Sequence, residues 1–194
     1  MDTLAADFLQ RLPTRSASDP GFYGAVLWPA ALLLAQVLAS APPLAGKTTF
    51  ELGAGTGLAS LAAATHGAHA IASDVYPLSL QLIQQSAAIP RPTLDVTAVH
   101  FDLFSAEPLP PRTDILLAAD VLYLTDLTRA VARRVAEAKK SGIQVLLTDS
   151  RGTHQAALLA ELEVLGVVGT FEPRDLDWLP AARHECASLL VFDE

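Results

Sequence analysis

Three glycines at alternate positions follow an apolar stretch of the chain and constrain its fold more than any other feature. The stretch reads FELGAGTGL, with Gly53, Gly55 and Gly57 directly after a predicted strand over residues 48–52. Glycine accepts positive φ and lets a ligand approach the main chain closely. A tight turn between a strand and a helix requires one glycine, so three at this spacing indicate a turn that contacts a ligand.

Apolar strands alternate with helices along most of the chain. A short amphipathic helix is predicted at the N-terminus, and further helices cover residues 30–40, 58–65, 77–88, 125–140 and 153–165, with Thr125 as the cap of the fourth of these. The predicted strands cover residues 48–52, 69–73, 95–101, 114–119, 143–148, 167–172 and 186–192. This order predicts an α/β domain with a mostly parallel sheet and helices on both faces, and the final pair of strands implies one antiparallel member.

Length and composition narrow the class of protein. A chain of 194 residues fits one domain over 1–194, with an N-terminal helix and lead-in over 1–20 and a core over 21–194. The net charge of −8 argues against a nucleic-acid partner, and a single cysteine, Cys186, excludes a disulfide framework or a thiolate metal site. The uncharged stretch between Asp19 and Lys47 is cut by prolines and is too short for a membrane span. Without a secretory signal, we expect a cytoplasmic protein with no metal.

Acidic residues follow three of the predicted strands. Asp74, Asp102 and Asp120 each stand just past the carboxyl end of a strand. In an open α/β sheet, ligands bind outside the carboxyl ends of the strands, at the point where the strand order reverses. Each aspartate alone is equally well explained as a loop residue or a helix cap, but three beside a glycine turn favour a binding site.

The spacing of the glycines separates three classes of ligand site. A dinucleotide fingerprint requires its third glycine where this chain has Leu58, and a P-loop requires Gly-Lys-Ser/Thr, which is absent from the turn. The run E-L-G-A-G-T-G instead resembles the first motif of the seven-stranded S-adenosylmethionine-dependent methyltransferases. The resemblance implies a Rossmann-like class I methyltransferase with S-adenosylmethionine as cofactor. Its implied contacts around the turn are Glu51, Gly53, Ala54 and Gly55.

Asp74 and Asp102 are expected at the other end of the cofactor. Asp74 would accept hydrogen bonds from both ribose hydroxyls, although an NAD enzyme would use an acid there in the same way. Asp102, or the amides beside it, would meet the adenine. These two residues therefore locate a nucleoside without identifying the cofactor, and the glycine spacing identifies it.

A second resemblance points to the methyl acceptor. The segments AADVLY (118–123) and VLWPAALLLAQVL (26–38) resemble the protein-lysine methyltransferases of the methyltransferase-like group, also called methyltransferase family 16, and the likeness extends over residues 22–192. The family implies cofactor contacts at Trp28 and Ala119, and an entrance for the target amine lined by Asp120 and Tyr123. Where the family often has a tryptophan beside the adenine, this chain has FDLF, so Leu103 or Phe104 would pack there.

The chemistry of a lysine acceptor fits these roles. Its amine has a pKa of about 10.4 and must be neutral to attack a sulfonium methyl group. A carboxylate at Asp120 would favour the charged ammonium, so we expect it to capture and orient the side chain, with Tyr123 as hydrogen-bond partner and aromatic wall. No separate general base is evident in the sequence. The predicted protein is a monomeric enzyme that acts on a lysine of a protein substrate.

Other functions remain open from the sequence. Adenine-N6 methyltransferases carry two prolines where this chain has Val121 and Leu122, which disfavours that activity. A small-molecule N- or O-methyltransferase would share the same core fold. A cofactor-binding subunit that no longer methylates is the alternative outside enzymes, and the intact glycine turn, Asp74 and D-x-x-Y run disfavour it.

Overall fold

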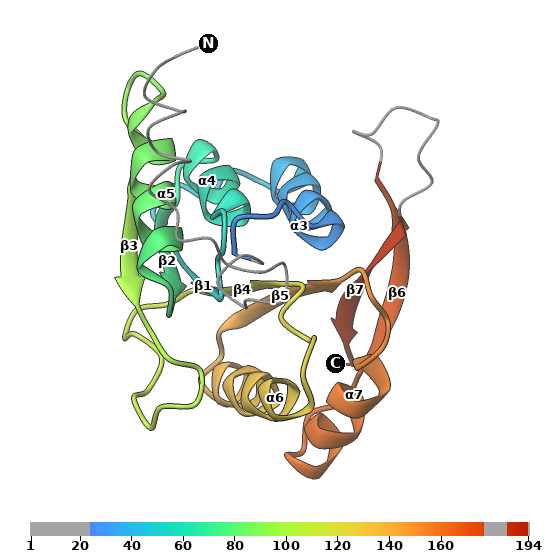
Figure 1. Ribbon diagram of the computed structural model, residues 1–194. Helices are drawn as coiled ribbons and strands as arrows, with labels where there is room; N and C mark the ends of the chain where they lie inside the picture. Colours follow the sequence, from blue (N-terminus) through green and yellow to red (C-terminus); the bar gives the residue numbers. More distant parts are fainter. Residues whose placement is uncertain (1–23, 177–185, 194) are drawn as a thin grey trace, which may run out of the picture.

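A computed structural model describes residues 24–176 and 186–193, and these form one seven-stranded sheet with helices on both faces (Figure 1). The strands are β1 (Thr48–Leu52), β2 (His69–Asp74), β3 (Val96–His100), β4 (Ile115–Ala119), β5 (Gln144–Asp149), β6 (Gly169–Asp175) and β7 (Cys186–Phe192). The helices are α3 (Pro29–Ser40), α4 (Leu58–Thr65), α5 (Pro77–Ala88), α6 (Thr125–Lys140) and α7 (Gln155–Val164). The predicted N-terminal helix lies outside the described residues.

The strand order is β3-β2-β1-β4-β5-β7-β6, which leaves β3 and β6 at the two edges. The first five strands pair in parallel, and β7 pairs antiparallel with both β5 and β6. The predicted mostly parallel sheet with one antiparallel strand near the C-terminus is therefore confirmed. The chain builds outward from β1 to β3 and then returns to place β4 on the other side of β1, so the strand order reverses between β1 and β4.

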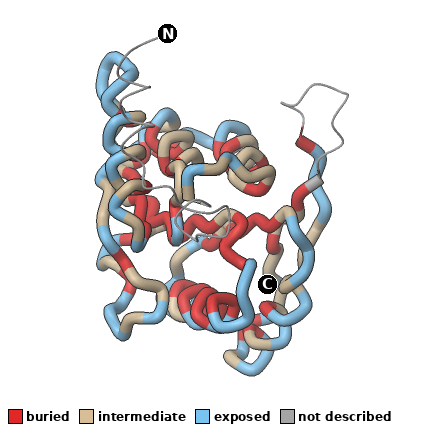
Figure 2. Tube along the Cα trace, viewed as in Figure 1, coloured by how far each residue is buried: buried red, intermediate tan, exposed pale blue. Residues whose placement is uncertain are grey.

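Two apolar layers sandwich the central strands. Leu116 and Ala118 of β4 belong to the cluster formed with α6 and α7, whereas Ile115 and Leu117 belong to the cluster formed with α3 and α4. Because successive side chains of a strand point to opposite faces, a strand buried on both faces must be apolar throughout. Buried residues follow the sheet and the inner sides of the helices, and exposed residues lie on the outer sides and in the loops (Figure 2).

The predicted boundaries shift in two informative places. The predicted strand 167–172 is in fact β6 (Gly169–Asp175). It begins later because the N–H of Val167 donates to the Leu162 carbonyl at the end of α7. It continues through Pro173 because β6 is an edge strand, where proline is tolerated. The prediction that Thr125 caps α6 is wrong. The chain is still extended at Leu124, whose carbonyl accepts the N–H of Thr128 at 2.9 Å, so Leu124 is the cap residue and Thr125 is the first residue of the helix.

Residues 24–176 and 186–193 contain neither a helix able to span a membrane nor a cluster of metal-binding side chains. No helix in these ranges is long and apolar enough to cross a membrane. In the same ranges, no cluster of three or more histidine, cysteine or acidic side chains is arranged to hold a metal ion.

Candidate active site

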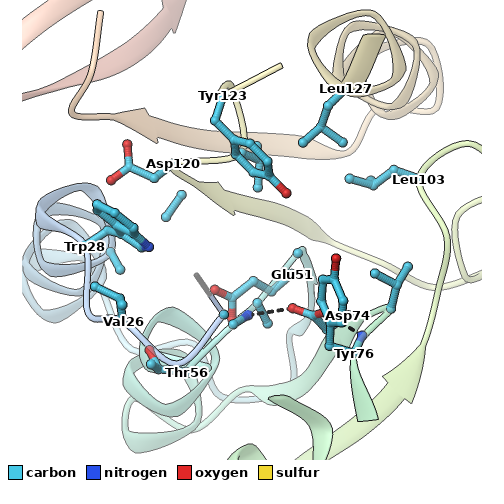
Figure 3. A pocket seen from close by; sticks show the side chains of 18 of the residues that line it. Val26, Trp28, Glu51, Thr56, Asp74, Tyr76, Leu103, Asp120, Tyr123 and Leu127 are labelled. Atoms are coloured by element: carbon cyan, nitrogen blue, oxygen red, sulfur yellow. Dashed lines mark hydrogen bonds between the residues drawn. The ribbon is translucent and has the colours of Figure 1, made fainter. Parts of the chain in front are cut away.

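A cavity of about 490 Å³ opens at the carboxyl ends of β1, β2 and β4, where the strand order reverses. Such a volume suits a ligand of cofactor size. Its walls come from the glycine turn, the end of β2, the loop after β3, the segment after β4 and the start of α3 (Figure 3). The structure brings all the predicted site residues to this cavity: Trp28, Glu51, Gly53, Ala54, Gly55, Asp74, Asp102, Leu103, Ala119, Asp120 and Tyr123.

The glycine turn requires glycine at each of its three positions. Gly53, Gly55 and Gly57 have φ of +57°, +54° and +75°, a region that L-residues with side chains rarely adopt. A Cβ on Gly57 would lie 2.6 Å from Cγ1 of Ile83 in α5, and one on Gly55 would lie 3.1 Å from the Gly24 carbonyl oxygen. Gly57 therefore allows α4 to pack closely against α5, while Gly53 and Gly55 leave their backbone accessible from the cavity.

Asp74 closes the turn from the neighbouring strand. It is the last residue of β2 and is buried, and its Oδ2 accepts the N–H of Gly55 at 2.9 Å (Figure 3). Its Oδ1 accepts the N–H of Tyr76, also at 2.9 Å. Each carboxylate oxygen has a second lone pair, so Asp74 still has acceptor capacity toward a ligand in the cavity.

Glu51 is a buried carboxyl group beneath the turn. Its Oε2 accepts hydrogen bonds from the backbone N–H and the hydroxyl of Ser60, which fixes the first turn of α4. Burial raises its pKa to about 7, and the nearby Asp74 carboxylate adds to the rise, while the Ser60 hydrogen bonds lower it. Glu51 is therefore a group whose charge changes close to neutral pH.

Asp120 is tied to two distant segments of the chain. Its Oδ1 accepts hydrogen bonds from the N–H and hydroxyl of Ser150, and its Oδ2 accepts the Ser150 hydroxyl and the N–H of Ala30. Its φ is +53°, which aspartate tolerates better than most residues. The side chain is 5% exposed, so both oxygens are occupied in joining β4, α3 and the loop after β5.

Aromatic side chains line the opposite end of the cavity from the glycine turn. Tyr123 is 37% exposed, and burial of the remainder raises its pKa above the usual range, with further contributions from Tyr76 and Asp74. Its hydroxyl therefore stays protonated at neutral pH. The Arg151 guanidinium lies 4.3 Å from the ring centroid of Trp28 and 5.8 Å from that of Tyr123.

The loop after β3 forms the remaining wall. Asp102 Oδ1 accepts the N–H of Phe104 at 2.9 Å, which holds this loop in a turn. Leu103 and Phe104 both line the cavity, and Phe104 is 54% exposed. Leu103 and Phe104 thus stand where the resemblance implies an adenine contact and where the family often has a tryptophan.

Some cavity residues had no part in the predicted site. Tyr76 follows Asp74 by two positions and Arg151 follows the end of β5, so the rule that ligands meet the carboxyl ends of strands would have pointed to both. Other additions lie within the segments quoted above but were given no role in the predicted site: Val26, Ala31, Thr56, Phe101 and Val121. The remaining additions lie outside those segments: Gly24, Val75, Leu124 and Leu127.

The fold and the site together define the class of protein. Solved structures with this fold include a TehB-like S-adenosylmethionine-dependent methyltransferase from Corynebacterium glutamicum, with a TM-score of 0.61 and 15% identity over 97% of both chains. Another is the magnesium protoporphyrin IX methyltransferase of Synechocystis, solved with bound S-adenosylmethionine, with a TM-score of 0.62 and 17% identity over 98% of this chain and 91% of that one. The fold is that of the S-adenosylmethionine-dependent methyltransferases, as predicted.

Sequence comparison then gives the family. The sequence pattern of the family described as lysine methyltransferase matches residues 17–163. This match covers most of the chain, and the protein therefore belongs to the lysine methyltransferase family. The resemblance drawn from AADVLY and the Trp-Pro-Ala-Ala helix start is confirmed.

Relatives within the family act on different targets. The chain is 36% identical over 107 residues to the histone-arginine methyltransferase METTL23 of Mus musculus, and 37% identical over 109 residues to the protein N-lysine methyltransferase METTL21A of the same organism. It is 27% identical over 151 residues to the calmodulin-lysine N-methyltransferase of Arabidopsis thaliana. These matches cover 52%, 53% and 72% of this chain, and the chain spans about half the length of each relative (42%, 49% and 50%).

Proposed function

We propose that this protein transfers a methyl group from S-adenosylmethionine to the side-chain amine of a lysine in a protein substrate. The observation that carries the proposal is the single cavity in which the glycine turn and Asp74 face Trp28 and Tyr123 across the end of the sheet (Figure 3). One end offers bare backbone and a carboxylate, which suit the cofactor. The other offers aromatic faces, which suit a cation.

The residues of the glycine side fit S-adenosylmethionine. Gly53 and Gly55 present backbone where a side chain would obstruct, and the start of α4 beside them favours a carboxylate. Asp74 has acceptor capacity for ribose hydroxyls, and Leu103 gives an apolar contact for adenine. When bound, the cofactor supplies an electrophilic methyl group on a sulfonium.

The residues of the opposite side would hold the amine. Tyr123 keeps a protonated hydroxyl at the mouth, able to accept a hydrogen bond from an ammonium and to present its ring as a wall. The amine must lose a proton before its lone pair can react, and the open mouth lets water take that proton. Both Asp120 oxygens are occupied by Ser150 and Ala30. The proposal therefore gives Asp120 a positioning role in place of the direct contact with the amine that the resemblance implies.

Apolar side chains around the mouth support a protein substrate. Among the large apolar residues that the described ranges leave exposed, Val75, Phe104, Tyr123 and Leu124 line this cavity. Exposed apolar residues gathered at one place on a surface are typical of an interaction site. A small molecule enclosed by the cavity would not require them to face solvent.

The proposal includes a monomeric protein in the cytoplasm that binds no nucleic acid. The net charge of −8 opposes a polyanionic partner. Light scattering of the purified chain and imaging of a tagged copy in cells test the oligomeric state and the compartment.

Labelling of a lysate tests the acceptor. The full chain is incubated with isotopically labelled S-adenosylmethionine and a protein lysate, and mass spectrometry locates the label. We expect label on lysine residues of a small set of proteins, and loss of this label with the Asp74→Ala variant. The Asp95→Ala variant, in which the side chain removed is 70% exposed at a distant ion pair with His69, serves as the matched control.

The other outcomes identify the alternatives. Label on arginine would favour an activity like that of the histone-arginine methyltransferase METTL23, to which the chain is 36% identical over 107 residues. Label confined to small molecules would overturn the protein substrate. Binding of S-adenosylhomocysteine without any transfer would indicate a non-catalytic partner subunit.

A further inference from the structure

The loop between β5 and α7 presents one arginine to the cavity from a fixed backbone. On one side of Arg151, Ser150 donates its N–H and hydroxyl to Asp120. On the other side, Gly152 donates its N–H to Oδ2 of Asp149 at 2.8 Å. Both acceptors are buried carboxylates at the ends of adjacent strands, so the backbone on each side of Arg151 is anchored while its side chain reaches toward the cavity.

The exposed Arg151 side chain lies within cation–π distance of two aromatic rings that come from distant parts of the sequence. Its guanidinium is 4.3 Å from the centroid of Trp28, at the start of α3, and 5.8 Å from that of Tyr123, after β4. Both distances fall within the range of a cation–π contact. Trp28 and Tyr123 therefore form an aromatic slot, and the slot holds a cation of the chain itself.

The charge of Arg151 contrasts with its surroundings. It is the single basic residue among the described residues that line the cavity, whereas Glu51, Asp74, Asp102 and Asp120 supply acidic groups. An acidic cavity with an aromatic slot is a favourable place for a cationic side chain from outside. Two cations within one slot repel each other, so an incoming cation and Arg151 exclude one another there.

We infer that Arg151 controls entry to the aromatic slot of Trp28 and Tyr123: its guanidinium occupies the slot and competes with the cationic side chain of the target. This inference rests on the proposed function, because it takes the slot as the entrance for the target amine. A target side chain must replace the guanidinium to enter. The two rings favour a cation over a neutral acceptor of the same size, and Arg151 adds a cost that any occupant of the slot must overcome.

Binding of the lysine side chain alone tests the inference without turnover. The probe is n-butylammonium, which reproduces the end of a lysine side chain, and n-butanol is its neutral match. The chain has two tryptophans, so Trp178→Phe leaves Trp28 as the single tryptophan, and its fluorescence reports occupancy of the slot. Titrations use this single-tryptophan full chain at constant ionic strength, with and without a second change at Arg151.

Removal of Arg151 should open the slot to the probe. We expect Arg151→Ala to bind n-butylammonium about fivefold more tightly than its parent, since one competing cation–π contact is removed. The affinity for n-butanol should rise less, because a neutral probe gains the vacated space but no relief from charge repulsion. Arg151→Lys should keep the weak affinity of the parent. Arg174→Ala removes an exposed arginine paired with Glu172 on β6 and should change nothing.

Three results would overturn the inference. They are equal affinity of the parent and Arg151→Ala for n-butylammonium, an equal gain for n-butanol, and no binding of n-butylammonium by Arg151→Ala. Once a protein substrate is found by labelling, Arg151→Ala should lower its KM and leave kcat within about twofold. A rise in KM would instead mean that Arg151 contacts the target.

The two proposals fail in distinguishable ways. S-adenosylhomocysteine binding and lysate labelling report on the proposed function and do not depend on the slot. Preference for n-butylammonium in Arg151→Ala reports on the slot and does not depend on methyl transfer.

Discussion

The two sides of the cavity are built in different ways. The glycine side comprises residues 51–57 and Asp74, and its carboxylate contact joins residues 19 positions apart. The aromatic side comprises Trp28, Asp120, Tyr123 and Arg151, and its Asp120 contacts join residues 30 and 90 positions apart. One side is thus a local strand–turn–helix unit with one contact to β2, whereas the other exists only once α3, β4 and the loop after β5 have come together. Removal of a side-chain contact should therefore cost more of the stability of the fold on the aromatic side than on the glycine side.

The largest effect is expected from Asp120→Ala on the aromatic side. The variant leaves the Ser150 and Ala30 donors without their acceptor, and each such loss costs about 1–3 kcal/mol. We expect a loss of about 4 kcal/mol in the free energy of unfolding, or roughly 10 °C in Tm for a domain of this size, measured by thermal denaturation. Asp120→Asn, which keeps one acceptor oxygen and tolerates the positive φ, should lose about half as much.

Asp126→Ala is the matched control for that comparison, because the Asp126 side chain is 82% exposed. It should leave Tm nearly unchanged. If Asp120→Ala melts with the parent, the aromatic side does not depend on this carboxylate and the contrast between the two sides is lost.

A somewhat smaller effect is expected from Gly57→Ala on the glycine side. An alanine there adopts a φ of +75° and meets the Ile83 side chain at 2.6 Å, where the buried isoleucine leaves little room. Left-handed backbone costs about 1–2 kcal/mol and overpacking about 1–3 kcal/mol, so we expect about 3 kcal/mol of destabilisation in urea unfolding. Gly142→Ala has a similar φ of +72° and open space around it, and should show the backbone cost alone.

Asp74→Ala should weaken the cofactor site with a smaller effect on the fold. The variant removes a charged acceptor from the cavity, and a hydrogen bond to a charged group contributes about 1.5–3 kcal/mol. We expect the Kd of S-adenosylhomocysteine to rise about thirtyfold by calorimetry, with Asp95→Ala unchanged because that side chain is 70% exposed. A Kd equal to that of the parent would mean that the ribose does not contact Asp74.

The smallest effect concerns pH and Glu51. Its pKa of about 7 in the fold exceeds the ordinary value of 4.5 for a glutamate, so the folded protein binds an extra proton between these pH values. The contribution of Glu51 to stability therefore falls as pH rises from about 4.5 through 7. The cationic α-amine of S-adenosylhomocysteine favours the ionised carboxylate of Glu51. The affinity for S-adenosylhomocysteine should therefore drop about tenfold from pH 8 to pH 6, as Glu51 takes up its proton. Glu51→Gln should flatten this profile, and a slope that survives the change would assign it to another group.

The glycine side could be predicted from sequence because its signals are local. Gly53, Gly55 and Gly57 are required by backbone conformation and close packing, and these requirements show in the sequence wherever the turn occurs. The alternation of apolar strands with helices likewise gave the parallel sheet, and the rule for strand ends brought Asp74 and Asp120 to one cavity.

The aromatic side could be predicted only in part. Tyr123 and Trp28 were found through a family resemblance. The rule for strand ends also applies to Arg151, just past β5, but its contacts with Trp28 and Tyr123 depend on α3 and β4 lying beside β5. The contacts of Asp120 with Ser150 depend on the register in which Ala119 pairs with Thr148. Spacing along the chain carries no record of that register, so the sequence predicted the place of Asp120 at the cavity but not the hydrogen bonds that it accepts from Ser150 and Ala30.

The edge strand β6 has a consequence for behaviour at high concentration. An exposed strand edge offers unpaired backbone groups to another molecule and can seed sheet-to-sheet association. Here the edge carries Pro173, which has no N–H to donate, and the oppositely charged Glu172 and Arg174, which form an exposed ion pair. These features are the ones by which natural sheets discourage strand addition. The β6 edge therefore protects the molecule from aggregation on that flank.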